Sequence, residues 1–340
     1  IAKNAKQTRF YYICILCVVK NMLSYVEING FTTSTGAFYP SLRLSYEVFG
    51  RPLGSPAPVV MVCHALTGNS NVCGQDGWWN GLISPANVVD TDKYCVLCFN
   101  IPGNGYDGFL LGDRYTDFTA RDIARLFVEG AKKLGVGRLH TMIGGSLGAC
   151  LVWEALAEYP DFAAQGVAVA GDWKSTDWVM GLSSVQMSML ARGDGGMYDA
   201  RMMTMLFFRT PQSFRDKFSR TENTDLGVPN VTSWLMHHGD KLSGRFSPDA
   251  YRLMTHLIST VDISRGRGSF ETAVGPVRSR IVQVGIDSDM YFQAYENEET
   301  HRALIAMGKD SHYLELKTPH GHDGFLIEFR QLQDLLRPFF

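Results

Sequence analysis

The sequence predicts an α/β protein: a mostly parallel sheet with helices on both faces and a helical lid inserted in the second half of the chain. Short apolar runs alternate with amphipathic segments along most of its 340 residues. The apolar runs are continuous, which is typical of strands with two buried faces. Residues 172–278 break this alternation with a Met-rich, helix-like stretch that contains no convincing buried strand. A long insertion between two strands predicts a cap over the sheet edge.

The elements follow one another in a regular order. Apolar runs predict strands at 44–49, 58–63, 94–99, 139–143, 165–170, 280–285 and 312–316. Helical periodicity predicts helices at 119–134, at 147–158 and from about Phe325 onward. The helix at 119–134 also has a start signal, because Thr119 can cap it and Asp122 stands at the capping-box position. We therefore expect one core, formed by 22–171 and 279–340, with 172–278 as its lid.

Composition and charge exclude several classes of protein. Forty-five per cent of the residues are hydrophobic, which is enough for a large buried core. The net charge is -2, from 32 Lys and Arg against 34 Asp and Glu, so there is no basic footprint for nucleic acid. The longest apolar run, 10–19, is about half of a membrane span. We expect no nucleic-acid partner and no membrane anchor, and we interpret residues 1–21 as a disordered or non-native extension.

The seven cysteines are odd in number and lie mostly within apolar runs. This usage is typical of a reduced, cytoplasmic protein and not of a disulfide-linked secreted one. The pairs Cys14/Cys17 and Cys95/Cys98 have C-x-x-C spacing, but neither opens a helix as a thioredoxin-type redox pair does. We therefore expect neither a redox nor a zinc role for them.

One segment has the pattern Gly-x-Ser-x-Gly, namely Gly144-Gly145-Ser146-Leu147-Gly148. The pattern alone is weak, but here it follows an apolar strand and opens a helix, which is the context of a nucleophile elbow. Such a turn is so tight that its flanking residues must be small, which explains the glycine at each end. It would expose Ser146 at the carboxyl edge of the sheet, near the positive end of the next helix. Ser146 is therefore the candidate nucleophile.

A serine hydroxyl needs a base and an acid to become a nucleophile, and in this architecture both follow the serine along the chain. The loop after the last predicted strand supplies His322, with His320 as the near competitor. The acid should follow an earlier strand, and Asp287, Asp289 and Asp172 all do so. Spacing alone does not choose among these three carboxylates.

Acyl transfer also needs two backbone N–H groups that bind the oxyanion. Leu147, directly after the serine, supplies one of them. Leu66, in the loop after the strand at 58–63, is the natural second donor. His64 in the same loop is interpreted as a structural, hydrogen-bonding residue and not as a base.

Two other patterns fail on their context. Residues 103–108 match the dinucleotide fingerprint Gly-x-Gly-x-x-Gly, but no helix begins at Gly108 to face a pyrophosphate, so we interpret them as an active-site loop. His320, His322 and Asp323 suggest a metal cluster, but no further group has the spacing of a metal ligand. We expect no metal and no cofactor.

Together these motifs resemble the homoserine O-acetyltransferase family of α/β-hydrolase-fold acyltransferases. The matching segments are 64–68, 77–79, 90–94, 143–148, 200–210, 238–251, 288–292 and 321–326. The resemblance implies that Ser146 is the nucleophile, Asp289 the triad acid and His322 the base. It also implies that Arg201 and Asp323 bind the amino-acid acceptor, since a guanidinium can hold a carboxylate and a carboxylate can hold an ammonium.

The resemblance further implies a ping-pong transfer of an acetyl group from acetyl-CoA, as co-substrate, to the hydroxyl of L-homoserine in methionine biosynthesis. It also implies a homodimer that pairs through the lid helices. Three departures from the family pattern leave alternatives open: residues 100–108 replace a longer loop at the acyl pocket, 171–173 read Gly-Asp-Trp, and 236–238 read Met-His-His. The alternatives are a succinyl-CoA- or serine-using enzyme of the same fold, an esterase, and a catalytically silent dimeric binding protein, against which the complete Ser, Asp and His set argues.

Overall fold

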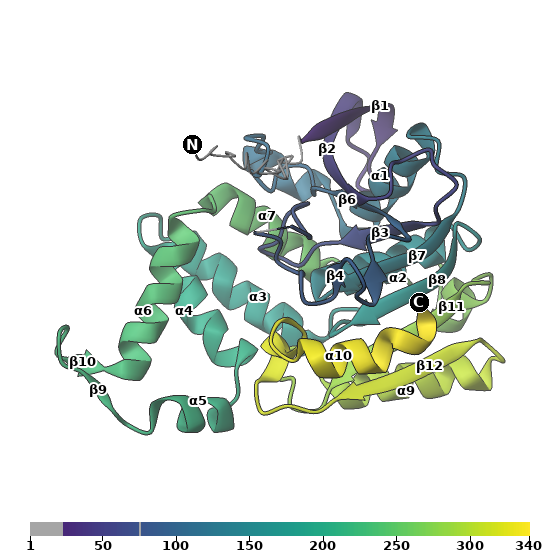
Figure 1. Cartoon of the computed structure of the whole chain (residues 1–340). Coiled ribbons are helices and arrows are strands. Elements are labelled where there is room, and N and C mark those ends of the chain that lie inside the picture. The colour runs from purple at the N-terminus through teal and green to yellow at the C-terminus, as the bar shows by residue number, and fades with distance from the viewer. Residues whose placement is uncertain (1–22, 75) are drawn as a thin grey trace, which may run out of the picture.

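The computed structural model describes residues 23–74 and 76–340, so the interpretation of residues 1–21, with Cys14 and Cys17, lies outside the described residues. Eight strands form one sheet in the order β1-β2-β6-β3-β7-β8-β11-β12 (Figure 1). From β6 to β12 all neighbours are parallel, whereas β1 and β2 are antiparallel at one edge. The strands are β1 (Ser24–Thr32), β2 (Phe38–Gly50), β3 (Val59–Cys63), β6 (Cys95–Phe99), β7 (Leu139–Gly145), β8 (Ala163–Val169), β11 (Arg280–Ile286) and β12 (Ser311–Leu316).

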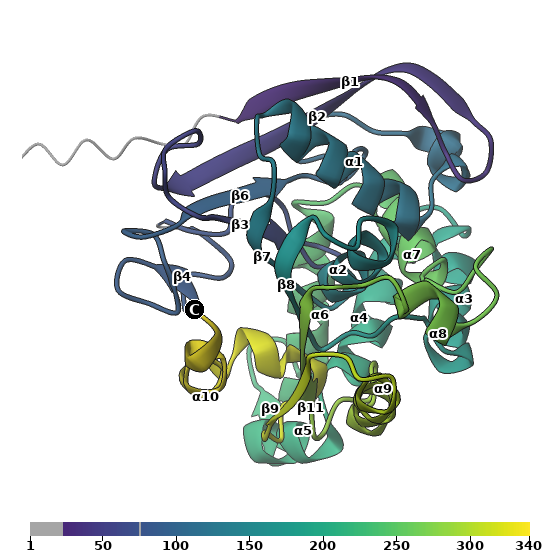
Figure 2. The same ribbon diagram turned by 90° about the vertical axis from the view of Figure 1, so that its right-hand side faces the viewer.

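Helices cover both faces of the sheet (Figure 2). On one face the core contains apolar side chains of α1 (Ala120–Lys133), α2 (Leu147–Glu158) and α9 (Ala294–Ala306). On the other face it contains those of α10 (Phe329–Leu336) and of the segment with the short strands β4 (Ile83–Ser84) and β5 (Val89–Asp90). The α/β fold class and the mostly parallel sheet are thereby confirmed.

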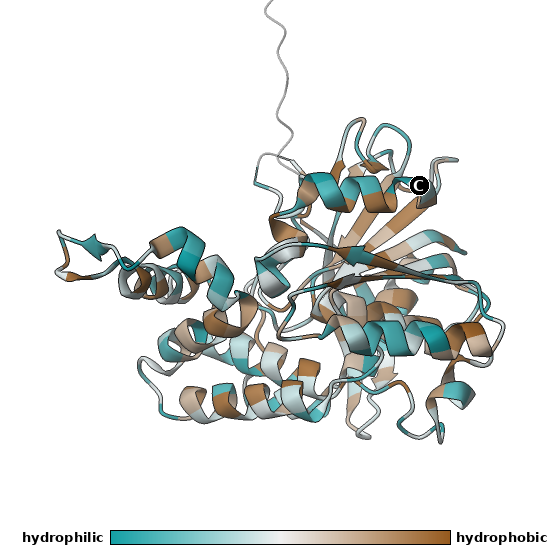
Figure 3. Cartoon of the chain, turned by 90° about the horizontal axis from the view of Figure 1, so that it is seen from below, coloured by the Kyte–Doolittle hydropathy of each residue, from teal (hydrophilic) through white to brown (hydrophobic). Residues whose placement is uncertain are grey.

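The continuous apolar strands fit this layering because alternate side chains of a strand point to opposite faces. In β3, Met61 and Cys63 pack with α1 and α2, whereas Val60 and Val62 pack with the opposite layer. Figure 3 shows the same pattern: the strands are mostly brown, and the helices around them are brown on one side and teal on the other. Burial on both faces is what the unbroken apolar runs predict.

Local signals locate several elements well. The predicted helix at 147–158 is α2, and α1 begins with a capping box in which the Thr119 N–H donates to the Asp122 carboxylate at 2.9 Å. The predicted start of the last helix near Phe325 is wrong, because a 3₁₀ turn (Gly321–Leu326) comes first and α10 begins at Phe329. Strand β1 and helix α9 were not predicted.

Residues 172–278 contribute no strand to the eight-stranded sheet. Their helices extend to one side of it, with the hairpin β9–β10 at the far tip (Figure 1). The elements are α3 (Asp177–Leu190), α4 (Gly196–Phe208), α5 (Pro211–Phe218), β9 (Glu222–Asn223), β10 (Val228–Pro229), α6 (Asn230–Ser243), α7 (Pro248–Ser259) and α8 (Phe270–Val274). Further 3₁₀ turns lie at Gly112–Asp117 and Arg337–Phe339. The boundaries of the lid and the core stay a prediction.

Candidate functional site

Ser146 lies in the sharp turn between β7 and α2. Its backbone has φ 58° and ψ -125°, in a region that residues with a side chain rarely adopt. A Cβ on Gly144 would lie 2.2 Å from the Gly148 carbonyl oxygen, and one on Gly148 would lie 2.0 Å from the Cys63 carbonyl oxygen. Because only glycine fits at these two positions, the turn can close and present the Ser146 hydroxyl at the carboxyl edge of the sheet.

Three side chains that are far apart in the sequence meet at this turn. The Ser146 Oγ lies 2.8 Å from Nε2 of His322, and Nδ1 of the same imidazole lies 2.7 Å from Oδ2 of Asp289. A carboxylate accepts hydrogen bonds only, so Nδ1 carries the proton and Nε2 is free to accept from the serine. The other carboxylate oxygen of Asp289 accepts the N–H groups of Tyr291 (2.6 Å) and Phe292 (3.1 Å), which fixes its orientation.

Aromatic rings surround the imidazole of His322, which is 2% exposed. Among the described residues, four rings have centroids within 6.0 Å of it, those of Phe208 (5.2 Å), Tyr291 (5.2 Å), Phe325 (5.7 Å) and Phe292 (6.0 Å). An apolar enclosure of this kind keeps water away from the His–Asp pair and strengthens the electrostatic interactions within it.

The two expected oxyanion donors lie at the same edge of the sheet. Cys63 pairs with Gly144 across β3 and β7, so the loop that begins at His64 lies beside the serine turn. None of the hydrogen bonds between described residues is donated by the backbone N–H of Leu66 or Leu147. Leu147 is also the first residue of α2, where the helix dipole favours negative charge. Both N–H groups are thus available to an oxyanion.

His64 fixes the loop that carries Leu66. Its Nδ1 donates to the Ala65 carbonyl oxygen at 2.8 Å, and its Nε2 accepts the N–H of Ile101 at 3.1 Å. Burial lowers the pKa of His64 to about 4, so the ring is neutral near pH 7. The side-chain amide of Asn104, within the Gly-rich 103–108 loop, lies 3.4 Å from the same Nε2. The geometry matches a structural role for His64 and joins the 103–108 loop to the site.

Comparison with known proteins identifies the family. Residues 58–246 match the family model described as the alpha/beta hydrolase fold. A homoserine O-acetyltransferase from Symbiobacterium thermophilum is 32% identical over 92% of each chain. Another, from Salinibacter ruber, is 33% identical over 93% of this chain and 96% of its own. The chain belongs to the homoserine O-acetyltransferase family. The resemblance predicted from the motifs is confirmed.

Solved structures share the fold. A homoserine O-acetyltransferase from Staphylococcus aureus, 25% identical, superposes with a TM-score of 0.78 over 94% of both chains. The enzyme of that name from Bacillus anthracis gives a TM-score of 0.85 at 17% identity, over 94% of this chain and 97% of its own. Esterase E22 gives a TM-score of 0.83 at 18% identity, over 94% of this chain and 99% of its own. The last two likenesses concern the fold alone, which family members and esterases have in common.

In this member of the homoserine O-acetyltransferase family, Arg201 and Asp323 both lie beside the Ser146 relay. Arg201 is on helix α4, and its buried Nε has no hydrogen-bond partner. No hydrogen bond or ion pair between described residues engages the Asp323 carboxylate. Burial raises its pKa, while the positive charges of Arg201, of a protonated His322 and of Arg209 act in the opposite direction. One cationic and one anionic group with unused hydrogen-bonding capacity thus lie close together, as a zwitterionic ligand requires.

The competing base and one competing acid have other partners. His320 Nδ1 lies 3.1 Å from Nη2 of Arg209 and 3.1 Å from Oγ of Ser213. Asp287 accepts the N–H of Thr318 at 3.0 Å and thereby holds the start of the histidine loop. No hydrogen bond or ion pair between described residues joins either side chain to Ser146 or to the imidazole of His322.

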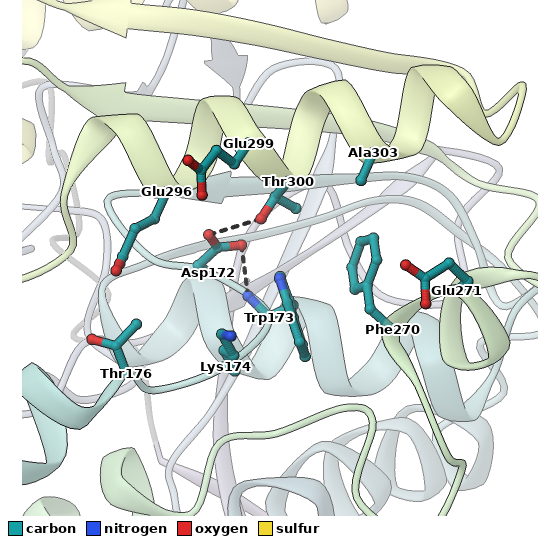
Figure 4. Close-up of a pocket in the computed structure, with 10 residues that line it drawn as sticks. All are labelled: Asp172, Trp173, Lys174, Thr176, Phe270, Glu271, Glu296, Glu299, Thr300 and Ala303. Atoms are coloured by element: carbon teal, nitrogen blue, oxygen red, sulfur yellow. Dashed lines mark hydrogen bonds between the residues drawn. The ribbon is translucent and has the colours of Figure 1, made fainter.

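The third candidate acid, Asp172, points toward helix α9 and its Thr300 (Figure 4). Its carboxylate accepts the N–H of Trp173 (2.8 Å), the hydroxyl of Thr300 (3.1 Å) and the amide of Gln283 (3.3 Å). Burial raises its pKa from 3.8 to about 7, with hydrogen bonds from Trp173, Thr300 and Asn297 acting in the opposite direction. The buried Oε1 of Gln283 has no donor. Asp172 is therefore a buried structural carboxyl that is half protonated near neutral pH.

Replacing Asp172 with asparagine should remove a pH dependence of stability. A raised folded-state pKa stabilises the fold fully below the unfolded value of 3.8, and this stabilisation is lost as pH rises through about 7. From pH 5 to pH 8 this single group should lower the free energy of unfolding by about 2.5 kcal/mol, since one pKa unit is about 1.4 kcal/mol. The asparagine side chain does not titrate, so D172N should lose less stability over this range. Urea unfolding at pH 5 and pH 8 measures this change in the free energy of unfolding. An equal change in D172N and in the exposed control D194N would contradict the prediction.

Membrane-spanning helices, metal-binding groups and disulfides can be checked over the described residues. No helix within residues 23–74 and 76–340 has the length and apolarity to cross a bilayer. In the same ranges no group of three or more His, Cys, Asp or Glu side chains could hold a metal ion. The five cysteines that the structure describes are buried and form no disulfide: Cys63, Cys73, Cys95, Cys98 and Cys150.

Proposed function

We propose that this chain transfers an acetyl group from acetyl-CoA to the hydroxyl of L-homoserine, a step of methionine biosynthesis, through an acyl group on Ser146. The observation that carries the proposal is the hydrogen-bonded relay from Asp289 through His322 to Ser146 in a member of this family. Relatives 32% and 33% identical over most of the chain bear the name homoserine O-acetyltransferase.

Acylation uses this relay. The Ser146 hydroxyl attacks the thioester carbon while Nε2 of His322 takes its proton, and the oxyanion accepts the N–H groups of Leu66 and Leu147. Asp289 holds the imidazole in its Nδ1–H tautomer and stabilises the imidazolium. When the intermediate collapses, the C–S bond breaks, the proton of His322 goes to the sulfur, and CoA leaves with the acetyl group retained on the serine.

Deacylation repeats these steps with the acceptor. The homoserine hydroxyl gives its proton to His322 and bonds to the acyl carbon, the bond to Ser146 Oγ breaks, and the proton returns to that oxygen. All of this is nucleophilic and acid–base chemistry that the side chains supply themselves. We therefore propose that no metal or cofactor takes part and that acetyl-CoA is a co-substrate.

Arg201 and Asp323 are proposed to hold the acceptor by its carboxylate and its ammonium group. Arg201→Ala should raise the KM for homoserine and lower kcat/KM by about 10- to 100-fold, because a charged hydrogen bond contributes about 1.5–3 kcal/mol. The KM for acetyl-CoA should change little. Initial rates over a matrix of both substrates check this, with the exposed Arg192→Ala as control. An unaltered homoserine KM in the Arg201 variant would refute the assignment.

Two copies of the chain are proposed to pair through the lid helices. Met180 and Val185 on α3 and Leu206 on α4 are 38%, 47% and 47% exposed, which is a large apolar surface for a free lid. Leu206→Asp should therefore convert a dimer of about twice 37.9 kDa into a monomer. Light scattering measures the mass, and Leu226→Asp, on the β9–β10 turn, is the matched control. A monomeric parent chain would end the proposal.

We also propose a cytoplasmic location, which the free buried cysteines support.

One assay tests the proposed function. The protein is incubated with acetyl-CoA, with and without L-homoserine, and free thiol and O-acetylhomoserine are measured. The proposal expects thiol release that depends strongly on homoserine, with one acetyl ester formed per thiol. Equal release without acceptor would identify an esterase-like hydrolase, and release only with succinyl-CoA or only with L-serine would identify the related transferases. No release with any acyl-CoA would leave a silent binding protein.

A further inference from the structure

Phe208, the last residue of lid helix α4, reaches from the lid onto the imidazole of His322. Their ring centroids are 5.2 Å apart and their planes are inclined by 33°. The edge of Tyr291 packs against the same phenyl ring at 5.3 Å. Of the four rings around His322, Phe208 alone comes from the lid. Tyr291, Phe292 and Phe325 are at most 2% exposed, whereas Phe208 is only half-buried. Phe208 is thus the one of these four rings that is partly exposed to solvent.

The residues that follow Phe208 tie it to the histidine loop. Arg209 lies 3.1 Å from Nδ1 of His320, and the Thr210 hydroxyl donates to the Pro319 carbonyl oxygen. A Cβ on Gly321, whose φ is +68°, would lie 3.0 Å from the Phe208 carbonyl oxygen, so the two backbones are in close contact. The phenyl ring therefore keeps its place unless the lid and the histidine loop separate.

Arg201, of the proposed acceptor site, also lies against the phenyl ring. The guanidinium carbon of Arg201 lies 5.6 Å from the ring centroid, within cation–π range. Phe208 is thus in contact with both the group proposed to hold the acceptor carboxylate and the base that must deprotonate the acceptor hydroxyl. The phenyl ring therefore fills space beside the imidazole that water could otherwise occupy.

From this geometry we infer that Phe208 excludes water from His322 and so directs the acyl group of acyl-Ser146 to the hydroxyl acceptor. The inference rests on the proposed function for the identity of the acceptor, but not for the role of the ring. Phe208 acts by filling space and supplies no nucleophile, proton or hydrogen bond to the reaction, so it is a specificity-determining residue and not a catalytic one.

The two competing reactions differ only in the nucleophile. In transfer, the acceptor oxygen bonds to the acyl carbon, its proton goes to Nε2 of His322, the C–O bond to Ser146 breaks, and the proton returns to Oγ. In hydrolysis a water molecule takes the place of the acceptor, and acetate is released. The base cannot distinguish two hydroxyl groups by proton affinity alone, so the discrimination has to come from which of them can reach it.

The experiment measures water-only deacylation in Phe208→Ala and Phe208→Leu. p-Nitrophenyl acetate acylates Ser146 without CoA; the burst of p-nitrophenol counts active sites, and the steady rate that follows is deacylation by water. Phe207→Ala is the matched control, because the Phe207 ring packs edge-on against Trp178 at 5.8 Å and not on His322. Adding L-homoserine to the same reactions then gives the ratio of transfer to hydrolysis.

The expected result is a graded rise in the water-only rate per active site. Phe208→Ala should increase it by about tenfold and lower the transfer-to-hydrolysis ratio by a similar factor, with Phe208→Leu between it and the parent chain. If the alanine variant shows no burst, the leucine variant decides by the same comparison. Water-only rates in the Phe208 variants equal to that of Phe207→Ala would overturn the inference. Failure of homoserine to accept in the parent chain would instead refute the proposed function and leave the water-only comparison valid.

Discussion

Replacing Ser146 with alanine abolishes thiol release from acetyl-CoA, both with and without homoserine. The Ser146 hydroxyl is the only group in the relay that can carry the acyl group. It is also the group that Nε2 of His322 contacts, at 2.8 Å, so the imidazole has no nucleophile to deprotonate once the hydroxyl is removed. Loss of a nucleophile in such a triad lowers kcat by about 10⁴- to 10⁶-fold. The measurement is the rate of thiol release, with mass spectrometry of the intact protein to look for an added acetyl group.

The alanine variant should remain folded, since alanine keeps the Cβ and adds no strain to the φ of 58° at this position. Its melting temperature should lie within a few degrees of the parent value. Ser184→Ala, at an exposed position on lid helix α3, is the control and should retain full activity. Transfer at an unchanged rate by the Ser146 variant, or an acetyl group still found on it, would remove the serine from the mechanism.

Replacing Asp289 with asparagine has the second largest expected effect. The N–H groups of Tyr291 and Phe292 already bond one carboxylate oxygen, so the asparagine oxygen should stay there and its NH₂ should face Nδ1 of His322. Nδ1 must then accept, and the proton moves to Nε2, which can no longer take the serine proton. Such a reversed tautomer costs about 10⁴-fold in kcat. Steady-state kinetics with saturating acetyl-CoA measure the loss.

Asp287→Asn is the matched control, because Asp287 also follows β11, yet its carboxylate bonds the Thr318 N–H and not the imidazole of His322. It should keep kcat within about tenfold of the parent value, since it only helps to hold the histidine loop. A comparable loss of kcat in both variants would show that the kinetics report the stability of the histidine loop and not the role of the triad acid. A larger loss in the Asp287 variant would reverse the choice of acid. The burst with p-nitrophenyl acetate gives the active fraction in each case.

The sequence predicts those helices, strands and turns that are determined by interactions between residues close together along the chain. The apolar runs of the buried strands, the boundaries of α2 and the capping box of α1 follow from periodicity and capping, which act within a few residues. The pattern around Ser146 predicts its turn because only glycine fits at 144 and 148. β1 was missed since one of its faces is mostly exposed, and α9 since the polar sequence Glu296–Thr300 lacks a clear apolar stripe.

The sequence by itself therefore determined the fold class, the nucleophile turn and a short set of candidate partners for Ser146. Spacing left Asp287, Asp289 and Asp172 open, because all three follow strands, and the family resemblance implied Asp289. The tertiary structure shows that, of these three carboxylates, the one of Asp289 reaches the imidazole of His322. It alone revealed Phe208, which lies 114 positions before His322 along the chain. Contacts of this kind depend on how the lid packs against the sheet. No local pattern of residues encodes a contact between side chains so far apart along the chain.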